Sequence, residues 1–119
     1  MKYGYSRTER VSELILQEVS LIIRNEVKDP GVGFVTLTSV EVSSDLRNAK
    51  IFISVMGDEK EKSTSLRALN RARGFIRSSF GGKVRLKYLP EMRFYLDRSL
   101  DRVKRINEIL REIDDKKSP

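Results

Sequence analysis

The chain is 119 residues long, which suits one domain, since a chain of this size buries roughly two-thirds of the surface that it exposes when unfolded. It contains no cysteine and no histidine, which excludes disulfides and thiolate metal sites and removes the commonest general base near neutral pH. The formal net charge of +7 favours an acidic partner, with nucleic acid first and an anionic membrane surface second; a basic protein without such a partner is the alternative.

A long amphipathic helix opens the predicted fold. After an arm of residues 1–5, Ser6 and Thr8 are N-cap candidates for a helix that runs to about Lys28. Its apolar residues recur at helical spacing and form one stripe, which we expect to cross a face of a sheet. Asp29-Pro30-Gly31 ends the helix, because proline disfavours helix at the residue before it and glycine permits a turn.

Two strands follow, over residues 34–42 and 49–56. The turn at Ser43-Ser44-Asp45 between them is short, so they are predicted to pair as an antiparallel hairpin. The second strand alternates cleanly between apolar and polar residues, which marks one covered face. In the first strand the apolar phase changes, and a bulge near Thr38 or Ser39 would reconcile the two halves.

The second half of the chain predicts a helical segment, a third strand and a last helix. The charged run 57–62 is interpreted as a loop, and Ser63, Thr64 or Ser65 as the cap of the next helix. Gly81-Gly82-Lys83 predicts a helix C-cap and the entry to a strand that reaches Leu96, bulged or exposed at Pro90 because proline cannot donate to a ladder. The last helix spans about Ser99 to Asp114. Its apolar stripe consists of Leu100, Val103, Ile106, Leu110 and Ile113.

The middle helix is predicted to break. On a straight helix from Thr64 to Phe80, Arg73 falls inside the arc of apolar side chains. A buried, unpaired guanidinium costs several kcal/mol, whereas a glycine break costs only about 1 kcal/mol. We therefore expect a kink at Ala72-Arg73-Gly74, the alternative being that Arg73 extends along the edge of the core. A kink would also offer the amides of the second half-helix to a phosphate.

Positive charge is concentrated around this kink. The stretch 66–87 has seven basic residues and no acidic one, and residues 67–111 hold 13 basic and 4 acidic residues, so the rest of the chain sums to −2. Such asymmetry indicates a binding surface rather than general solubility. Among the nearby aromatic residues, Phe75, Tyr88 and Phe94 are expected in the core, which leaves Tyr95 on the solvent side.

Catalysis finds little support in the sequence. Asp97 and Asp101 could share a helix face, but arginines surround them, so ion pairs are favoured over a metal site. Ser43 and Ser44 have no histidine to activate them. We expect no enzymatic activity, no metal and no cofactor. No apolar run is long enough to span a membrane and the N-terminus has no signal-peptide core, so we expect a cytoplasmic protein without a membrane partner.

Several short motifs nonetheless match a known family in their order and spacing. They are Arg7-x-x-Arg10-Val11, Asp29-Pro30, Val35-Thr36-Leu37-Thr38, Val42-Ser43-x-Asp45-Leu46-x-x-Ala49, Ala72-x-Gly74-x-Ile76-Arg77, Pro90-Glu91 and Phe94-x-x-Asp97. Over residues 5–113 the chain resembles the ribosome-binding factor A family, bacterial assembly factors of the small ribosomal subunit. The resemblance implies an α+β fold: a type II KH-like domain in the order α-β-β-α-kink-α-β, with helices on one face of a three-stranded sheet, plus a C-terminal helix.

The resemblance also implies a domain division and a function. Residues 1–5 would be an arm, 6–97 the KH-like RNA-binding domain and 98–119 a C-terminal helix and tail. The Ala72-Arg73-Gly74 kink would replace the Gly-x-x-Gly loop of KH domains. The factor would bind the immature 30S subunit as a monomer, assist late maturation and 5′-end processing of its 16S rRNA, and contribute to cold adaptation.

We assign RNA binding to the basic residues around the kink and along the third strand, with Gly74 allowing close approach of an RNA backbone. The predicted RNA-binding residues are Arg67, Arg71, Arg73, Gly74, Arg77, Lys83, Arg85, Lys87 and Arg93. Without the Gly-x-x-Gly loop, recognition should depend on shape and charge more than on sequence. The alternative is a basic protein-interaction adaptor that does not bind RNA directly and meets an acidic protein or anionic lipid instead.

Overall fold

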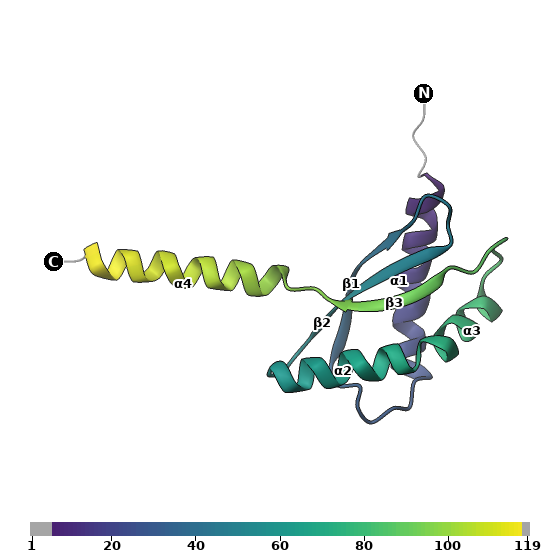
Figure 1. Cartoon of the computed structure of the whole chain (residues 1–119), viewed down its shortest axis with the longest axis horizontal. Coiled ribbons are helices and arrows are strands. Elements are labelled where there is room, and N and C mark those ends of the chain that lie inside the picture. Colours follow the sequence, from purple (N-terminus) through teal and green to yellow (C-terminus); the bar gives the residue numbers. More distant parts are fainter. Residues whose placement is uncertain (1–5, 118–119) are drawn as a thin grey trace.

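Seven helices and strands follow one another in the computed structural model, which describes residues 6–117 (Figure 1). In chain order they are α1 (Arg7–Asn25), β1 (Val35–Val42), β2 (Asn48–Val55), α2 (Glu59–Arg71), α3 (Arg73–Lys83), β3 (Glu91–Leu96) and α4 (Ser99–Lys117). This order confirms the predicted α+β class with its helix break and added C-terminal helix. The arm predicted for residues 1–5 and the last two tail residues lie outside the described residues.

The three strands form one mixed sheet in the order β1-β2-β3. β1 and β2 pair antiparallel as the predicted hairpin, and β3 pairs parallel to β2. The register passes from Leu37 opposite Ile53 to Ser39 opposite Phe52, so Thr38 is the extra residue of a bulge, as predicted.

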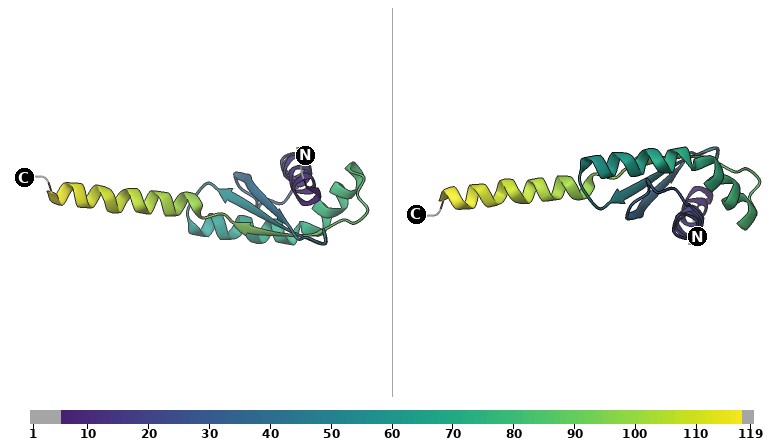
Figure 2. Two further views of the ribbon diagram at one scale, coloured as in Figure 1. Left: turned by 90° about the horizontal axis from the view of Figure 1, so that it is seen from above. Right: turned by 90° about the horizontal axis from the view of Figure 1, so that it is seen from below.

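The helices cover one face of the sheet and leave the other open. The buried side chains of β2 are Ala49, Ile51, Ile53 and Val55, and they pack with residues of α1, α2, α3 and β3 in one core. In Figure 1 the strands pass in front of α1, while α2 runs along the outer edge of β3; the two further views separate these layers (Figure 2). The alternating side chains of β2 and β3 therefore face solvent on the side without a covering helix.

α1 begins on a side-chain hydrogen bond and ends on a main-chain one, from the Glu26 amide to the Ile22 carbonyl. Ser6 is its N-cap, since its hydroxyl accepts from the amide of Glu9 at 3.2 Å, which confirms one of the two predicted caps. The helix ends at Asn25, three residues before the predicted Lys28. The side chain of Glu26, the C-cap, bonds to α3 and so belongs to a tertiary contact there.

α2 begins earlier than the sequence analysis predicted. Residues 57–62 were interpreted as a loop with a cap among the following serines and threonine, and this was wrong. Asp58 is the N-cap: its carboxylate accepts from the amide of Glu61 at 2.8 Å, and the Glu61 carboxylate accepts from the amide of Asp58 at 3.3 Å. This reciprocal capping box satisfies two amides that a helix start otherwise leaves free, and so the charged run is helical.

The predicted break between α2 and α3 is present. α2 ends at Arg71, α3 begins at Arg73, and Ala72 between them has φ −88° and ψ 1°. Arg73 is half-buried, so its side chain reaches solvent past the rim of the core. Ile76 and Phe80 of α3 are fully buried, so the apolar side of the second half-helix also packs into the core.

The third strand is shorter than predicted. α3 continues through Gly81 to Lys83, residues 84–90 are irregular, and β3 begins only at Glu91. Gly81 lies within the helix and not at its expected end, and a Cβ there would lie 2.6 Å from the end of the Leu89 side chain, which packs closely over it. Pro90 cannot donate to a ladder, and the strand starts directly after it.

Two aromatic residues expected in the core are on the surface. Phe75 is 53% exposed and Tyr88 46% exposed, whereas Phe94 is buried as predicted. Phe75 lies on the side of α3 that faces away from the buried Ile76 and Phe80, so the break does not bring it into the core. Tyr88 lies in the irregular segment before β3, where strand alternation does not apply.

α4 projects away from the rest of the domain (Figure 1). Its first turn is tied to α2: Arg98 pairs with Glu59 at 2.8 Å and Asp101 pairs with Lys62 at 3.6 Å. The apolar side chains along its length are exposed. They are Val103, Ile106, Ile109, Leu110 and Ile113. The side chain of Leu100, predicted in the same stripe, lies outside the described part of the chain. None of the helices within residues 6–117 has the length and hydropathy of a membrane span.

Candidate nucleic-acid interface

The start of α3 is open to an anion. Ala72 is its N-cap residue and provides no side-chain hydrogen bond to the helix, and the first turn has no acidic residue. Gly74, one residue into the helix, is exposed, and a Cβ there would have no heavy atom within 4 Å. The helix dipole and the backbone amides at this end favour negative charge.

Arg73 lines a pocket of about 410 Å³ beside β2 and β3. Lys50 and Arg93, which are direct register partners on these strands, line it as well, together with Tyr95. Arg73 and Arg93 make no hydrogen bond or ion pair with other described residues. Three cations from three elements therefore line one depression, and two of them have no hydrogen-bond or ion-pair partner among residues 6–117.

A second pocket, of about 630 Å³, adjoins the first, because Asn48 and Glu91 line both. Its cations are Arg47, Arg77 and Lys87. We call the two sets together the cationic corner. It consists of Arg47, Lys50, Arg73, Arg77, Lys87 and Arg93.

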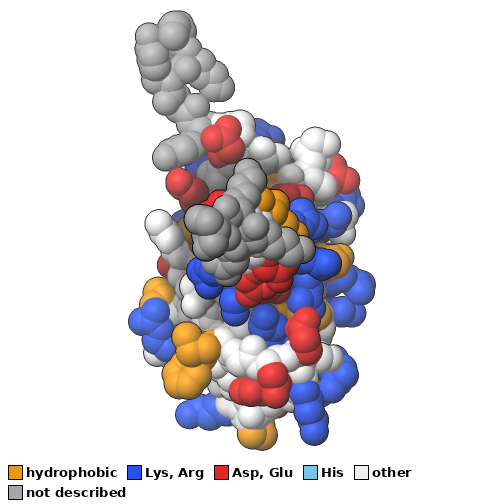
Figure 3. Space-filling view, turned by 90° about the vertical axis from the view of Figure 1, so that its left-hand side faces the viewer, with side chains coloured by type: hydrophobic (Ala, Val, Ile, Leu, Met, Phe, Trp, Pro, Cys, Tyr) orange, Lys and Arg blue, Asp and Glu red, His pale blue; other side chains and the backbone are white. Residues whose placement is uncertain are grey.

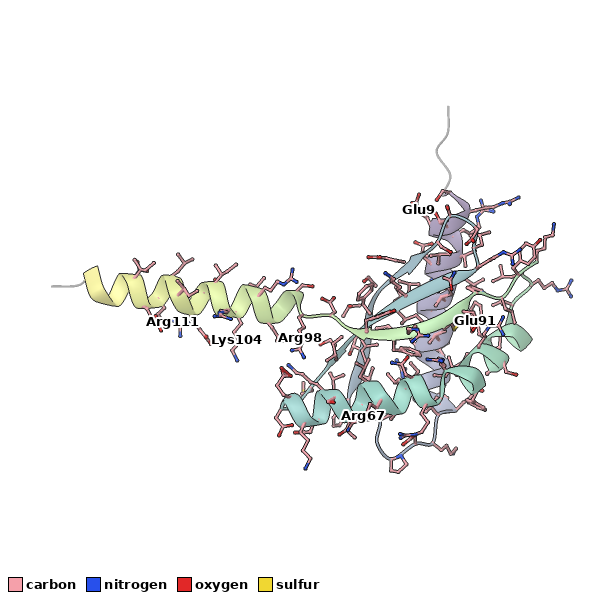
Figure 4. All side chains as sticks on the ribbon, viewed as in Figure 1. Glu9, Arg67, Glu91, Arg98, Lys104 and Arg111 are labelled. Atoms are coloured by element: carbon pink, nitrogen blue, oxygen red, sulfur yellow. The ribbon has the colours of Figure 1, made fainter. Side chains whose placement is uncertain are left out.

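The cationic corner lies on one side of the molecule. Seen along α4, Lys and Arg side chains gather on the right-hand side of Figure 3, which is the side that faces the reader in Figure 1. In Figure 4 the label of Glu91, which lines both pockets, locates the cationic corner at the start of β3, above α3. The charge asymmetry read from the sequence is thus also an asymmetry in space.

The structure brings together four of the eight predicted basic residues: Arg73, Arg77, Lys87 and Arg93. Arg77 differs from the others, because its guanidinium donates to the main-chain carbonyls of Leu89 and Pro90 at 2.8 and 3.1 Å. It therefore positions the segment that leads into β3, whatever else it binds.

Two predicted residues near the break form ion pairs elsewhere. Arg71 donates to the Asp29 carboxylate at 2.8 Å, and Lys83 pairs with Glu26 at 3.1 Å. The Gly31 amide and the Arg71 guanidinium lower the pKa of Asp29, and the Ser79 hydroxyl and Lys83 lower the pKa of Glu26. Both contacts join the end of α1 to the helices around the break.

The remaining two predicted basic residues are single exposed cations. Arg67 lies on the outer face of α2 and bonds to Ser63 at 3.2 Å (Figure 4), and Arg85 lies in the irregular segment after α3. Neither lines the two pockets of the cationic corner. An RNA-binding role for any of these residues stays a prediction.

Sequence reasoning missed Arg47 and Lys50, which lie outside the basic stretch of the second half. The signal that could have found them is the solvent phase of β2 combined with parallel pairing to β3, which places residues 48–53 beside 91–96. Tyr88 was missed as well, and the Arg47 and Lys87 cations lie 5.2 and 5.5 Å from its ring.

The carboxylates considered for metal binding have other partners. Asp97 accepts from the hydroxyl and amide of Ser99 and from the Thr38 hydroxyl, which lowers its pKa from 3.8 to about 2. Asp101 pairs with Lys62 and Arg98. Among the described residues, no group of three potential ligands that could hold a metal ion is found.

Sequence comparison places these features in a known family. The family model described as ribosome-binding factor A matches residues 7–110. The chain is 49% identical to ribosome-binding factor A of Halothermothrix orenii over 107 residues, covering 90% of this chain and 88% of that protein. It is 51% identical to the Desulforamulus reducens protein of the same description over 107 residues, covering 90% and 89%.

Structure comparison agrees. A solution structure of a Thermotoga maritima protein superimposes with a TM-score of 0.71 and 31% identity, covering 83% of this chain and 94% of that one. The crystal structure of ribosome-binding factor A from Thermus thermophilus superimposes with a TM-score of 0.68 and 23% sequence identity, covering 82% of this chain and 100% of that one. A third match is a homology model of the Thermus thermophilus factor that was fitted into a cryo-electron microscopy map of its complex with the 30S subunit. It superimposes with a TM-score of 0.56 and 22% sequence identity, covering 77% of this chain and 92% of that one. The chain described here belongs to the ribosome-binding factor A family.

Proposed function

We propose that this protein binds the small ribosomal subunit during its assembly and contacts 16S rRNA through the cationic corner. In this role it assists late maturation of the subunit and processing of the 5′ end of its RNA, as a cytoplasmic monomer without catalytic activity. Family membership supports the ribosomal partner, and the fitted complex of the Thermus thermophilus factor supports the 30S subunit as that partner.

One observation carries the assignment of the face. Arg73 and Arg93 line the same pocket, on the open side of the sheet, without a hydrogen bond or ion pair to another described residue. Like charges held together without counter-charges favour a polyanion, and RNA phosphates supply one. The uncapped start of α3 adds backbone amides beside them.

The test is co-sedimentation with purified small subunits. Changing Arg73→Glu and Arg93→Glu together should abolish binding, with a circular dichroism melt close to that of the wild type. Arg93→Glu alone, at a fully solvent-facing position, should weaken binding in the same direction. Lys60→Glu is the matched control, since it reverses one exposed charge at the far end of α2. Arg77 is unsuited to this test because of its contacts with Leu89 and Pro90.

Salt dependence and RNase separate RNA binding from protein binding. If about six phosphates are neutralised, affinity should fall by about a hundredfold or more between 50 and 200 mM salt. Crosslinks from the bound protein should fall on 16S rRNA. Full co-migration of the double variant would show that the cationic corner is not the RNA contact. Binding that is indifferent to both salt and RNase would show that the protein is an adaptor for another protein.

A further inference from the structure

The open face of the sheet carries a pair of aromatic rings. Phe52 on β2 and Tyr95 on β3 are direct register partners, and their ring centroids lie 5.8 Å apart with a 33° angle between the planes. Tyr95 remains 36% exposed. The helices pack on the opposite face, so nothing among the described residues covers this ring pair from the front.

Cations flank these rings. The Lys50 ammonium lies 5.9 Å from the centre of the Tyr95 ring, and Lys50 is in register with Arg93. Two carboxylates lie beside this stretch of strand: Glu41 is the register partner of Lys50 on β1, and Glu91 lines the same pocket. The cations of the cationic corner outnumber them, so the electrostatic field over the rings favours an anionic ligand.

A second exposed aromatic ring, that of Tyr88, lies in the pocket that adjoins the one lined by Tyr95. Tyr88 lies before β3 between the Arg47 and Lys87 cations, and the pocket it lines shares Asn48 and Glu91 with the pocket lined by Tyr95. Aromatic rings and cations thus alternate along β3 and the segment before it. Grooves for single-stranded nucleic acid have this composition, because cations follow the backbone while bases stack on rings.

We propose that the open sheet face binds unpaired RNA, with one base stacked on Tyr95 and the adjoining phosphates at Lys50 and Arg93. This inference rests on the proposed function and deepens it: the ligand of the cationic corner is a single-stranded segment rather than a duplex. A duplex would present phosphates to the same cations, but its bases are stacked within the helix and cannot reach the ring of Tyr95.

The ring pair also has a simpler use, since cross-strand aromatic pairs stabilise sheets on their own. The two roles differ in what they require. Packing against Phe52 affects the melting temperature, whereas stacking affects RNA affinity at a given degree of folding. An experiment that measures both on the same variants tells them apart.

The experiment measures binding of a fluorescently labelled oligoadenylate of about eight nucleotides by anisotropy, beside a duplex of the same length. Tyr95→Ala should weaken single-strand binding by about fivefold to a hundredfold, and Tyr95→Phe should restore it to within about twofold. Phe34→Ala is the control, because it removes an exposed ring just before β1 that lines neither pocket of the cationic corner.

Salt titration separates stacking at Tyr95 from phosphate contact at Lys50. Tyr95→Ala should keep the wild-type salt slope, because it removes no phosphate contact, whereas Lys50→Gln should reduce the slope by about 0.7. Circular dichroism melts confirm that each variant is folded at the temperature of the measurement.

The outcomes separate this inference from the proposed function. If wild-type protein co-sediments with small subunits but binds the duplex as tightly as oligoadenylate, or if Tyr95→Ala binds oligoadenylate like the wild type, stacking is wrong and the subunit assignment stands. If wild-type protein does not co-sediment with subunits, the proposed function fails, and the inference fails with it.

Discussion

Asn70 on α2 holds Phe94 on β3 through two main-chain hydrogen bonds. The side-chain NH2 group of Asn70 donates to the main-chain carbonyl of Phe94 at 3.1 Å, and the side-chain oxygen of Asn70 accepts from the main-chain amide of Phe94 at 2.9 Å. β3 is an edge strand, so these groups would otherwise be free to pair with another chain. One side chain thus takes the place of a fourth strand at this point and fixes α2 against the sheet.

Replacing this contact should destabilise the domain without changing its surface charge. Asn70→Ala removes both hydrogen bonds and leaves two part-buried main-chain groups without partners, for a loss of about 2 kcal/mol in the free energy of unfolding, measured by urea denaturation. Asn70→Asp keeps the acceptor for the Phe94 amide but sets a carboxylate oxygen against the Phe94 carbonyl oxygen, so at neutral pH it should be no more stable than Asn70→Ala. An Asn70→Ala variant as stable as the wild type would contradict the two-bond account.

The capping box at the start of α2 gives a second prediction. Asp58→Ala should lower the free energy of unfolding by about 1 kcal/mol, because the amide of Glu61 loses its acceptor. Asp58→Asn, which keeps a side-chain oxygen at the N-cap, should lose only a few tenths of that. Thermal unfolding followed by circular dichroism measures both. An Asp58→Ala variant as stable as wild type would mean that the residues after Gly57 are a loop, as the charge pattern suggested.

Gly74 offers a test of close approach at the break. A methyl group there meets no heavy atom within 4 Å, so Gly74→Ala should leave the fold intact and raise stability by up to about 1 kcal/mol. Co-sedimentation with small subunits should nonetheless weaken, because the methyl group keeps an RNA backbone away from α3. Gly82→Ala is the matched control: it lies on the same helix, with open space around its Cβ position as well. Equal binding by the two variants would remove Gly74 from the contact.

Asp97 should make stability depend on pH in the acid range. Its folded-state pKa is lowered from 3.8 to about 2, chiefly by the Ser99 hydroxyl and then by the Thr38 hydroxyl. The ionised carboxylate therefore contributes its full stability above about pH 4 and loses it as the pH falls through 2. The difference in melting temperature between wild type and Asp97→Asn should be constant above pH 4 and shrink towards pH 2. A constant difference over the whole range would show that the charge of Asp97 has no part in it.

The main layout of the fold could be predicted because apolar periodicity dominates its core. The stripe of α1, the alternation of β2 and the conflict at Arg73 each follow from side-chain direction alone, and the bulge at Thr38 follows from a phase change. The start of α2 was hidden because its cap lies in a run of charges, where composition indicates a loop and only the Asp58–Glu61 spacing indicates a helix.

The candidate site was predictable only in part, because it is assembled across the sheet. The basic second half of the chain located Arg73 and Arg93, but it also suggested Arg71 and Lys83, which form ion pairs with Asp29 and Glu26 just after α1. Lys50 joins the site through parallel pairing of β2 with β3, a non-local relationship that the sequence pattern does not contain.

That parallel pairing also dictates an order of assembly. β1 and β2 can pair starting from the turn between them. β3 reaches β2 only after residues 56–90 have formed α2 and α3 on the side of the sheet that the helices cover. A two-stranded hairpin needs further packing to be stable in water, and α1, which precedes it in the chain, supplies part of that packing. The outer edge of β2 nevertheless stays open until β3 docks, so the sheet and its core are completed only late in the chain. On the ribosome that makes this protein, completion of the sheet has to wait until β3 has left the exit tunnel.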